Sequence, residues 1–94
     1  MDVARAWLAL GNNKKAMEII NALWLNSAQY TYWFNSLSGS AFNMSQDSWI
    51  MHFYIMQQLL GLVQSVDEKW YETHYKELGA HAATFEQKGG KLGI

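Results

Sequence analysis

The residues of this 94-residue chain best suited to metal or acid–base chemistry are its three histidines, because the chain contains no cysteine. His74, Glu77 and His81 are spaced by three and four positions, which places them on one face of a helix. Imidazole and carboxylate groups are zinc ligands. The helical rise separates His74 from His81 by about 10 Å, however, so one ion cannot easily bind both. We therefore predict no metal site, and we expect these side chains on a solvated mixed face.

The other candidate residues do not form a catalytic set. His52 falls on the apolar face of its segment, where a histidine packed in the core or at an interface is expected. Gly89, Gly90 and Lys91 lack the preceding strand, the full spacing and the following helix of a phosphate-binding loop. No constellation of a nucleophile with a base stands out. We predict no catalytic residue and no cofactor.

Charge and composition narrow the class of partner. The formal net charge is -1, with acidic and basic residues dispersed, so no basic stripe is available for nucleic acid. The most apolar stretch, Trp49 to Val63, is too short to span a bilayer comfortably and indicates a buried helix. No signal peptide is visible, and without cysteine the redox compartment is not indicated, so the localisation stays open.

The candidate histidines lie in predicted helices. Apolar side chains recur every three to four positions in successive segments, and this spacing is typical of helices that bury one face. Proline is absent, which suits a chain of nearly uninterrupted helices. The predicted fold is all-α, with about five helices in stacked antiparallel hairpins. The predicted helices cover residues 2–10, 13–25, 27–37, 46–65 and 68–88. They form a single domain over 1–88, followed by a flexible glycine-rich tail over 89–94.

Glycine and polar residues mark the predicted helix ends. Gly11 is expected to end the first helix with a positive φ, and Asn12 or Asn13 to cap the second. Asn26 and Ser27 are expected to separate the second helix from the third.

Glycine and polar residues also mark the predicted helix ends in the second half of the chain. A loop rich in serine, glycine and asparagine is predicted over 36–45, after which Ser45 or Asp47 caps the fourth helix and Asp67 the fifth.

The fourth predicted helix is expected to supply the centre of the core. Its apolar stripe of Trp49, Phe53, Met56 and Leu60 forms the predicted central seam. Methionine is flexible and fills irregular gaps. Met44, Met51 and Met56 are therefore all expected in the core.

The third predicted helix contains a run of aromatic residues that core packing alone does not explain. Tyr30, Tyr32, Trp33 and Phe34 span most of a helix circumference and cannot all face one core. Two alternatives remain at this stage. The surplus side chains either pack against the 36–45 loop or form an interface.

The first hairpin resembles a tetratricopeptide repeat. Small Ala4, aromatic Trp7, turn Gly11, small Ala16 and apolar Ile20 fall at the spacing of that motif. The sequence departs from the motif at Leu23, where a small residue is usual, and in the absence of a closing proline near Ala28. The resemblance covers about a quarter of the chain and implies a helical hairpin that presents a surface for binding.

A wider resemblance joins this hairpin to two later segments. The runs from Tyr30 to Leu37 and from Ile55 to Leu59 are similar to the C-terminal tail of a large Bacteroidetes membrane protein family. Those proteins resemble glycosyltransferases of the protein O-mannosyltransferase type, which use lipid-linked sugars. The resemblance implies that catalysis belongs to a membrane portion outside this chain. It also implies a membrane-bound parent, with this domain possible on the periplasmic side.

Two functions are therefore expected. The first is a non-catalytic helical module for protein interaction or scaffolding, forming the C-terminal part of a larger protein. The alternative is an accessory tail that positions acceptor protein for a membrane glycosyltransferase. The expected partner is an upstream segment, another protein or a second copy of the chain. The predicted interaction surface consists of Trp7, Trp24, Tyr30, Tyr32 and Trp33.

Overall fold

The computed structural model describes residues 1–91, and every regular element among them is an α-helix. The predictions of an all-α fold and of helical hairpins are therefore confirmed. The helices are α1 (Asp2–Ala9), α2 (Asn13–Asn35), α3 (Gly39–Met44), α4 (Gln46–Val63) and α5 (Glu68–Gln87).

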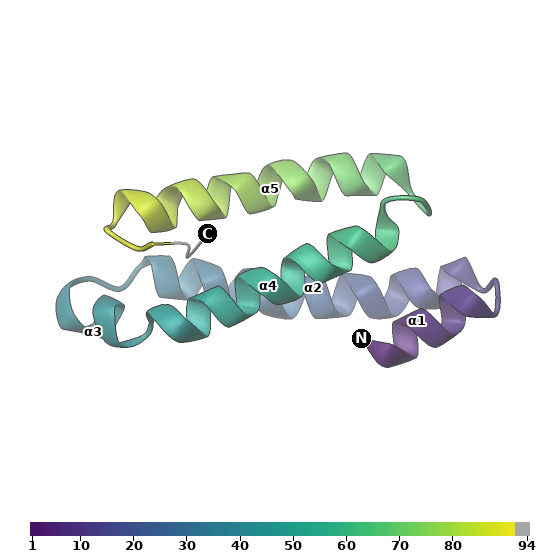
Figure 1. The fold of residues 1–94 in the computed structure, drawn as a ribbon, viewed down its shortest axis with the longest axis horizontal. Coiled ribbons are helices and arrows are strands. Elements are labelled where there is room, and N and C mark those ends of the chain that lie inside the picture. The colour runs from purple at the N-terminus through teal and green to yellow at the C-terminus, as the bar shows by residue number, and fades with distance from the viewer. Residues whose placement is uncertain (92–94) are drawn as a thin grey trace.

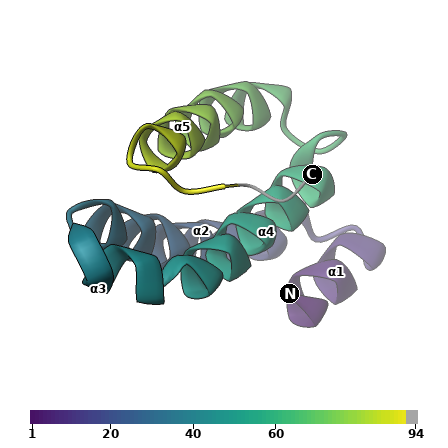
Figure 2. The ribbon, with the colours of Figure 1, turned by 60° about the vertical axis from the view of Figure 1, so that its left-hand side comes forward.

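Three long helices run along the long axis of a molecule that measures 46 × 22 × 21 Å (Figure 1). α4 runs antiparallel to α2, and α5 runs antiparallel to α4. The short α1 folds back along the first part of α2, so that these two form the first hairpin. Figure 2 shows α5 lying over the layer that α2 and α4 form. α2 packs against α1, α4 and α5.

The turn of the first hairpin follows the predicted chemistry. Gly11 has a φ of +80°, and its N–H donates to the Leu8 carbonyl while the Asn12 N–H donates to the Trp7 carbonyl. This pair of bonds is the Schellman arrangement that closes a helix with a left-handed residue. The Asn12 side chain then accepts from the Lys15 N–H and caps α2.

The second and third predicted helices are one continuous helix, α2, so the predicted break at Asn26 and Ser27 is wrong. Asparagine and serine are only mildly unfavourable inside a helix. Ser27 is buried, and its hydroxyl hydrogen-bonds to Nδ1 of His52 at 3.2 Å. The next residue, Ala28, lies in the main core. Tertiary packing on both sides of the expected break therefore outweighs the weak local signal.

The other helix ends differ from the predictions in smaller ways. The segment 36–45 is not all loop, because it contains α3, whose Phe42 is buried. The predicted cap from Ser45 or Asp47 is wrong, since no side chain makes a capping bond at the start of α4. Asp67 does cap α5, accepting from the Trp70 N–H at 3.1 Å. α1, α4 and α5 each end one or two residues before the predicted boundary.

The core divides into two clusters along the long axis. The larger cluster joins α1, α2, α4 and α5, and the smaller joins α2, α3, α4 and α5. The buried members of the larger cluster are Ala4, Ile20, Trp24, Ala28, Met56, Leu59, Leu60, Val63 and Leu78. Those of the smaller cluster are Phe34, Phe42, Trp49 and Phe85.

The predicted central seam on α4 is largely present. Trp49, Met56 and Leu60 are buried, whereas Phe53 is half-buried and packs against both clusters. Phe85 lies flat on Trp49, with ring centroids 3.9 Å apart and planes tilted by 7°. The aromatic stack therefore holds α5 to α4 at one end of the molecule.

The methionine prediction holds only in part. Met56 is buried, but Met44 and Met51 are mostly exposed, so the expectation that they fill core gaps is wrong. Met44 is the last residue of α3, which is too short to bury a second face. Met51 lies on the side of α4 that faces away from Trp49 and Met56.

The left-handed turn gives a direct stability test. We expect Gly11→Val to lower the free energy of unfolding by about 1–2 kcal/mol, because a β-branched residue is strained at positive φ. Steric contact would not contribute, since nothing lies within 4 Å of a Cβ placed at Gly11. Gly61→Ala is the control, since an alanine in the open helical position of Gly61 should stabilise the fold by about 0.5–1 kcal/mol. Urea denaturation measures the change in unfolding free energy of both variants. Equal midpoints for Gly11→Val and wild type would contradict the turn assignment.

The aromatic stack gives a second stability test. Phe85 is completely buried, so Phe85→Ala should cost roughly 3–5 kcal/mol of unfolding free energy. Phe53→Ala should cost less, because that ring is half-buried. Thermal and chemical denaturation of the two variants would decide, and an equal loss in both would argue against the stack as the main contact at this end.

Candidate functional site

The structure separates the five residues of the predicted interaction surface. Tyr32 and Trp33 are 68% and 56% exposed on the outer face of α2, while Trp7 and Tyr30 are half-buried. Trp24 is buried at 4% exposure, so its assignment to a surface is wrong. The ring of Trp24 is covered by α5, which follows it by more than forty residues in the chain. The first hairpin alone therefore gave no signal of this burial.

Trp24 sits in a group of rings between α2 and α5. Its ring meets those of Trp70 and His74 edge to face, with centroids 5.5 and 5.0 Å away. Trp70 and His74 stack on each other at 3.8 Å, and the Trp70 indole donates to Asn21 Oδ1 at 2.7 Å. These contacts fasten the start of α5 to α2.

The aromatic run from Tyr30 to Phe34 was expected either to pack against the 36–45 loop or to form an interface, and the position of Tyr30 bears on this choice. Its ring stacks on His52 of α4 at 4.0 Å, and it packs against the smaller core cluster. Phe34 is fully buried in that cluster against Phe42 of α3. The run is therefore divided, since Tyr30 and Phe34 pack inside and Tyr32 and Trp33 remain at the surface.

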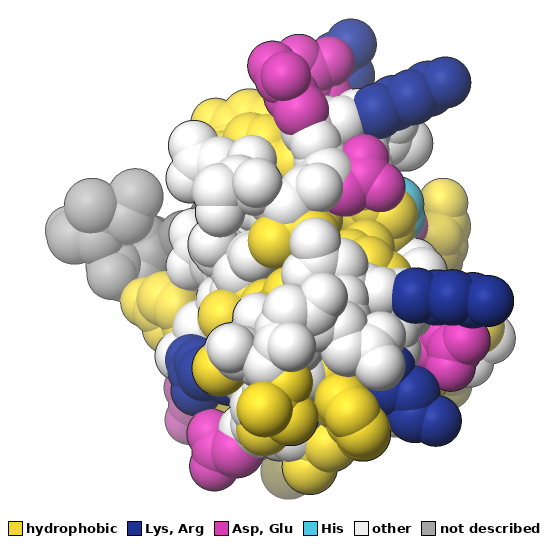
Figure 3. Space-filling model, turned by 90° about the vertical axis from the view of Figure 1, so that its right-hand side faces the viewer, with side chains coloured by type: hydrophobic (Ala, Val, Ile, Leu, Met, Phe, Trp, Pro, Cys, Tyr) yellow, Lys and Arg dark blue, Asp and Glu magenta, His cyan; other side chains and the backbone are white. Residues whose placement is uncertain are grey.

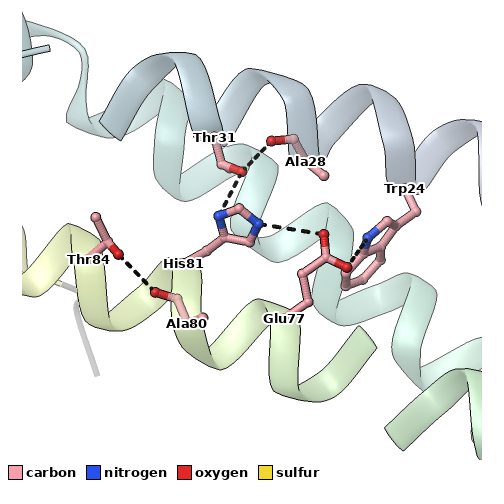
Figure 4. Close-up of polar contacts among 7 residues, drawn as sticks. All are labelled: Trp24, Ala28, Thr31, Glu77, Ala80, His81 and Thr84. Atoms are coloured by element: carbon pink, nitrogen blue, oxygen red, sulfur yellow. Dashed lines mark hydrogen bonds and ion pairs between the residues drawn. The ribbon is translucent and has the colours of Figure 1, made fainter. Parts of the chain in front are cut away.

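A polar network crosses the α2–α5 contact beside this group (Figure 4). Thr31 Oγ1 donates to the Ala28 carbonyl at 2.9 Å and lies 3.5 Å from Nδ1 of His81. On the other side of the imidazole, Nε2 lies 3.7 Å from Glu77 Oε1. Glu77 Oε2 accepts from the Trp24 indole N–H at 3.3 Å. The carboxylate therefore joins the histidine to the buried tryptophan.

This order of carboxylate, imidazole and hydroxyl is superficially that of a catalytic triad. The hydroxyl is the wrong kind, however, because Thr31 is fully buried and its proton is donated to a helix carbonyl. A nucleophile must be free to transfer its proton to the base and must reach a substrate. The arrangement therefore orients the histidine between two helices and offers no nucleophile.

Burial sets the protonation state of the two inner histidines. Desolvation lowers the pKa of His81 below its usual value, although the Glu77 carboxylate acts in the opposite direction. Burial also lowers the pKa of His52. Both histidines are therefore held in the neutral form near pH 7.

The expected solvated face of His74, Glu77 and His81 is not observed. His81 is only 5% exposed, and His74 is half-buried against Trp70, whose carbonyl lies 2.8 Å from its Nδ1. The sequence spacing correctly placed the three on one side of α5, but that side faces α2. Within residues 1–91, no group of three or more acidic or histidine side chains is arranged to hold a metal ion.

A small pocket opens beside the network. It has a volume of about 130 Å³ and is lined by Tyr32, Asn35, Glu77, Ala80, His81 and Thr84. Two of its polar atoms, Asn35 Oδ1 and His81 Nε2, are buried and have no hydrogen-bond partner within the part of the chain that the structure describes. Asn35 was not singled out in the sequence, because only α5 gives this residue its polar surroundings.

Two other depressions lie away from the network. A shallow one of about 290 Å³ lies around α3, between Leu37, Phe42 and Lys88, and the Lys88 ammonium donates to the Leu37 carbonyl at its edge. A groove between α4 and α5 consists of two hollows whose linings share Gln57, Tyr75 and Leu78. The charged side chains at the end bearing the α1–α2 and α4–α5 turns do not gather by sign (Figure 3).

Comparisons with known protein families, with curated proteins and with solved structures found no match. The fold and the site show that residues 1–91 form an all-α domain of five helices, with a polar network between α2 and α5. No helix within residues 1–91 combines the length and the apolar character needed to cross a membrane.

The neutral histidines predict a pH dependence of stability. The unfolded chain takes up protons on histidine near pH 6.5. The folded pKa of His81 and of His52 is lower, so the unfolded state binds more protons as the pH falls. Stability is therefore fully present above about pH 6.5 and is lost as the pH falls below it.

Urea midpoints between pH 7.5 and 5 would measure this loss, since most carboxylates stay ionised over that range. The slope should become shallower in His81→Gln and shallower again in the double variant with His52→Gln. A wild-type midpoint that does not change over this range would contradict the assignment of His81 and His52 as neutral in the folded state.

Proposed function

We propose that this chain is a non-catalytic helical module whose outer α2 surface binds a protein partner. The outer α2 surface consists of Leu25, Gln29, Tyr32 and Trp33. Positions separated by four, seven or eight residues share one face of a helix, so these four side chains form a single stripe. All four are exposed.

The exposure of Tyr32 and Trp33 is the observation that carries the proposal. Tyrosine and tryptophan are enriched at the centres of protein interfaces, where a few large side chains provide most of the binding energy. The fold packs the half-buried Tyr30 and the buried Phe34 against the smaller core cluster but leaves these two rings exposed. A rigid helix that presents aromatic anchors also loses little conformational entropy on binding.

A second apolar surface on α1 supports the same function. Val3 and Leu10 are mostly exposed, and the half-buried Trp7 has the Lys15 ammonium 5.9 Å from its ring. In stacked helical hairpins each unit covers the apolar face of its neighbour. We therefore propose that the apolar surface on α1 contacts an adjoining helical segment or a second copy of the chain. The alternative role, as an accessory part of a membrane glycosyltransferase, is supported by the sequence resemblance alone.

Selection of peptide ligands would test the outer α2 surface. A displayed library of helical and extended peptides is panned on the folded domain, and the enriched peptides are measured against two double variants. Leu25→Ser with Trp33→Ser should weaken binding by about tenfold or more, because interface aromatics commonly contribute at least 2 kcal/mol.

Tyr54→Ser with Tyr75→Ser is the matched control, since these exposed rings lie on α4 and α5. Binding to the control should change by less than about twofold. Circular dichroism would verify that both variants fold. Peptides that bind both variants as tightly as the wild type, or the failure of any peptide to enrich, would contradict the proposal.

A further inference from the structure

The pocket between α2 and α5 is lined by polar atoms that can accept hydrogen bonds, two of which lie 3.7 Å apart. Its polar lining includes Glu77 Oε1, His81 Nε2 and Asn35 Oδ1. The last two atoms have no partner among residues 1–91. A buried polar atom without a hydrogen bond destabilises the fold, because its bonds to water are lost and not replaced, so two in one small pocket require an explanation.

The tautomer of His81 follows from its neighbour Thr31. A hydroxyl has a single proton, and Thr31 gives that proton to the Ala28 carbonyl. Thr31 Oγ1 is then available to the imidazole as an acceptor, and we therefore assign the ring proton to Nδ1. In the neutral ring, Nε2 then presents a lone pair to Glu77 Oε1 at 3.7 Å. Two acceptors at this separation repel each other unless a donor lies between them.

We propose that this pocket binds the primary ammonium group of a lysine side chain supplied by a protein partner. This inference rests on the proposed function and names the chemistry of the partner. An ammonium group carries three N–H donors, and three atoms of residues that line the pocket, Glu77 Oε1, His81 Nε2 and Asn35 Oδ1, can accept them. Its positive charge also pairs with the Glu77 carboxylate, in a partly buried site where such a pair is weakly screened.

The geometry favours lysine over arginine. A guanidinium group binds carboxylates best with two parallel bonds to both oxygens. One oxygen of Glu77 already accepts from the Trp24 indole, so only the other is available. A compact ammonium needs only that oxygen.

The wall of the pocket suits the rest of a lysine side chain. Tyr32 meets the His81 ring edge to face at 4.9 Å and is itself mostly exposed, so it lies at the boundary between pocket and solvent. Its ring can contact the aliphatic part of a lysine and attract the charge. Tyr32 also belongs to the outer α2 surface, which makes the pocket continuous with the proposed interface. No lysine or arginine of residues 1–91 lines the pocket.

Nuclear magnetic resonance titration with n-butylammonium tests the site without a protein partner. We expect saturable shifts of the His81 ring nitrogens and of the Asn35 side-chain amide. n-Butanol has the same chain without the charge, and tetramethylammonium has the charge without N–H donors, so both should produce smaller shifts there. n-Butylguanidinium should bind more weakly than n-butylammonium.

Glu77→Gln is the decisive variant. Its amide oxygen can still accept from Trp24, and its NH₂ group can donate to His81 Nε2, so the fold should be retained while n-butylammonium binding falls at least tenfold. Glu72→Gln removes the same charge from an exposed position on α5 and should leave the titration unchanged. Asn35→Asp replaces the side-chain amide by a carboxylate, whose two oxygens are both acceptors, and should tighten n-butylammonium binding.

Three results would overturn the assignment. They are equal binding by the Glu77→Gln and Glu72→Gln variants, shifts with n-butanol as large as those with n-butylammonium, or ring-nitrogen signals that place the free-state proton on Nε2. If peptides bind the outer α2 surface but n-butylammonium does not bind the pocket, only the lysine assignment fails. If n-butylammonium binds and no peptide does, the protein partner is wrong and the pocket is a site for small free amines.

Discussion

The continuity of α2 is the constraint on which the rest of the structure depends. Its 23 residues pack against α1 and α4 on one part of their circumference and against α5 on another. At 1.5 Å per residue such a helix extends about 35 Å, most of the length of the molecule. A break near Ser27 would separate Trp24 from Thr31 and uncouple the two core clusters. The buried side chains of α2 recur along its whole length, which explains why the helix continues through weak formers.

α5 is held to the other helices by different chemistry along its length. Near its start, Trp70 and His74 pack against Trp24, and near its end Phe85 stacks on Trp49. Between these aromatic contacts lies the network of Glu77 and His81. Apolar packing supplies the larger stabilisation, and the polar network adds orientation, because its bonds form only when α5 has one register on α2. His81 Nε2, which has no hydrogen-bond partner among residues 1–91, lowers the net contribution of the network.

The same helix therefore serves the core and the proposed interface. The inward stripe of α2 fixes α4 and α5, and that attachment prevents Tyr32 and Trp33 from turning inward. An anchor held on a rigid element is pre-organised for a partner. The acceptor pocket adds a polar requirement beside these rings, which would select a partner by charge as well as by shape.

Much of the architecture could be predicted from the sequence. Three-to-four-residue periodicity and the absence of proline indicated an all-α fold, and Gly11, Asn12 and Asp67 marked helix ends correctly. These features are local, because a turn or a cap is decided within a few residues. The spacing of Trp49, Met56 and Leu60 likewise identified the inner face of α4.

The tertiary structure alone decided which residues are buried and which polar groups meet. Trp24 and His81 are buried because α2 and α5 lie against each other, although Trp24 precedes its partner Glu77 by 53 positions. Thr31 and Asn35 gain their role from the same contact, as nothing in their own segment distinguishes them. A sequence records periodicity within one helix, whereas the rotation of one helix against another is set by the packing of both surfaces. For that reason the sequence indicated helices and candidate aromatics, and only the packed structure separated core from surface and assembled the acceptor pocket.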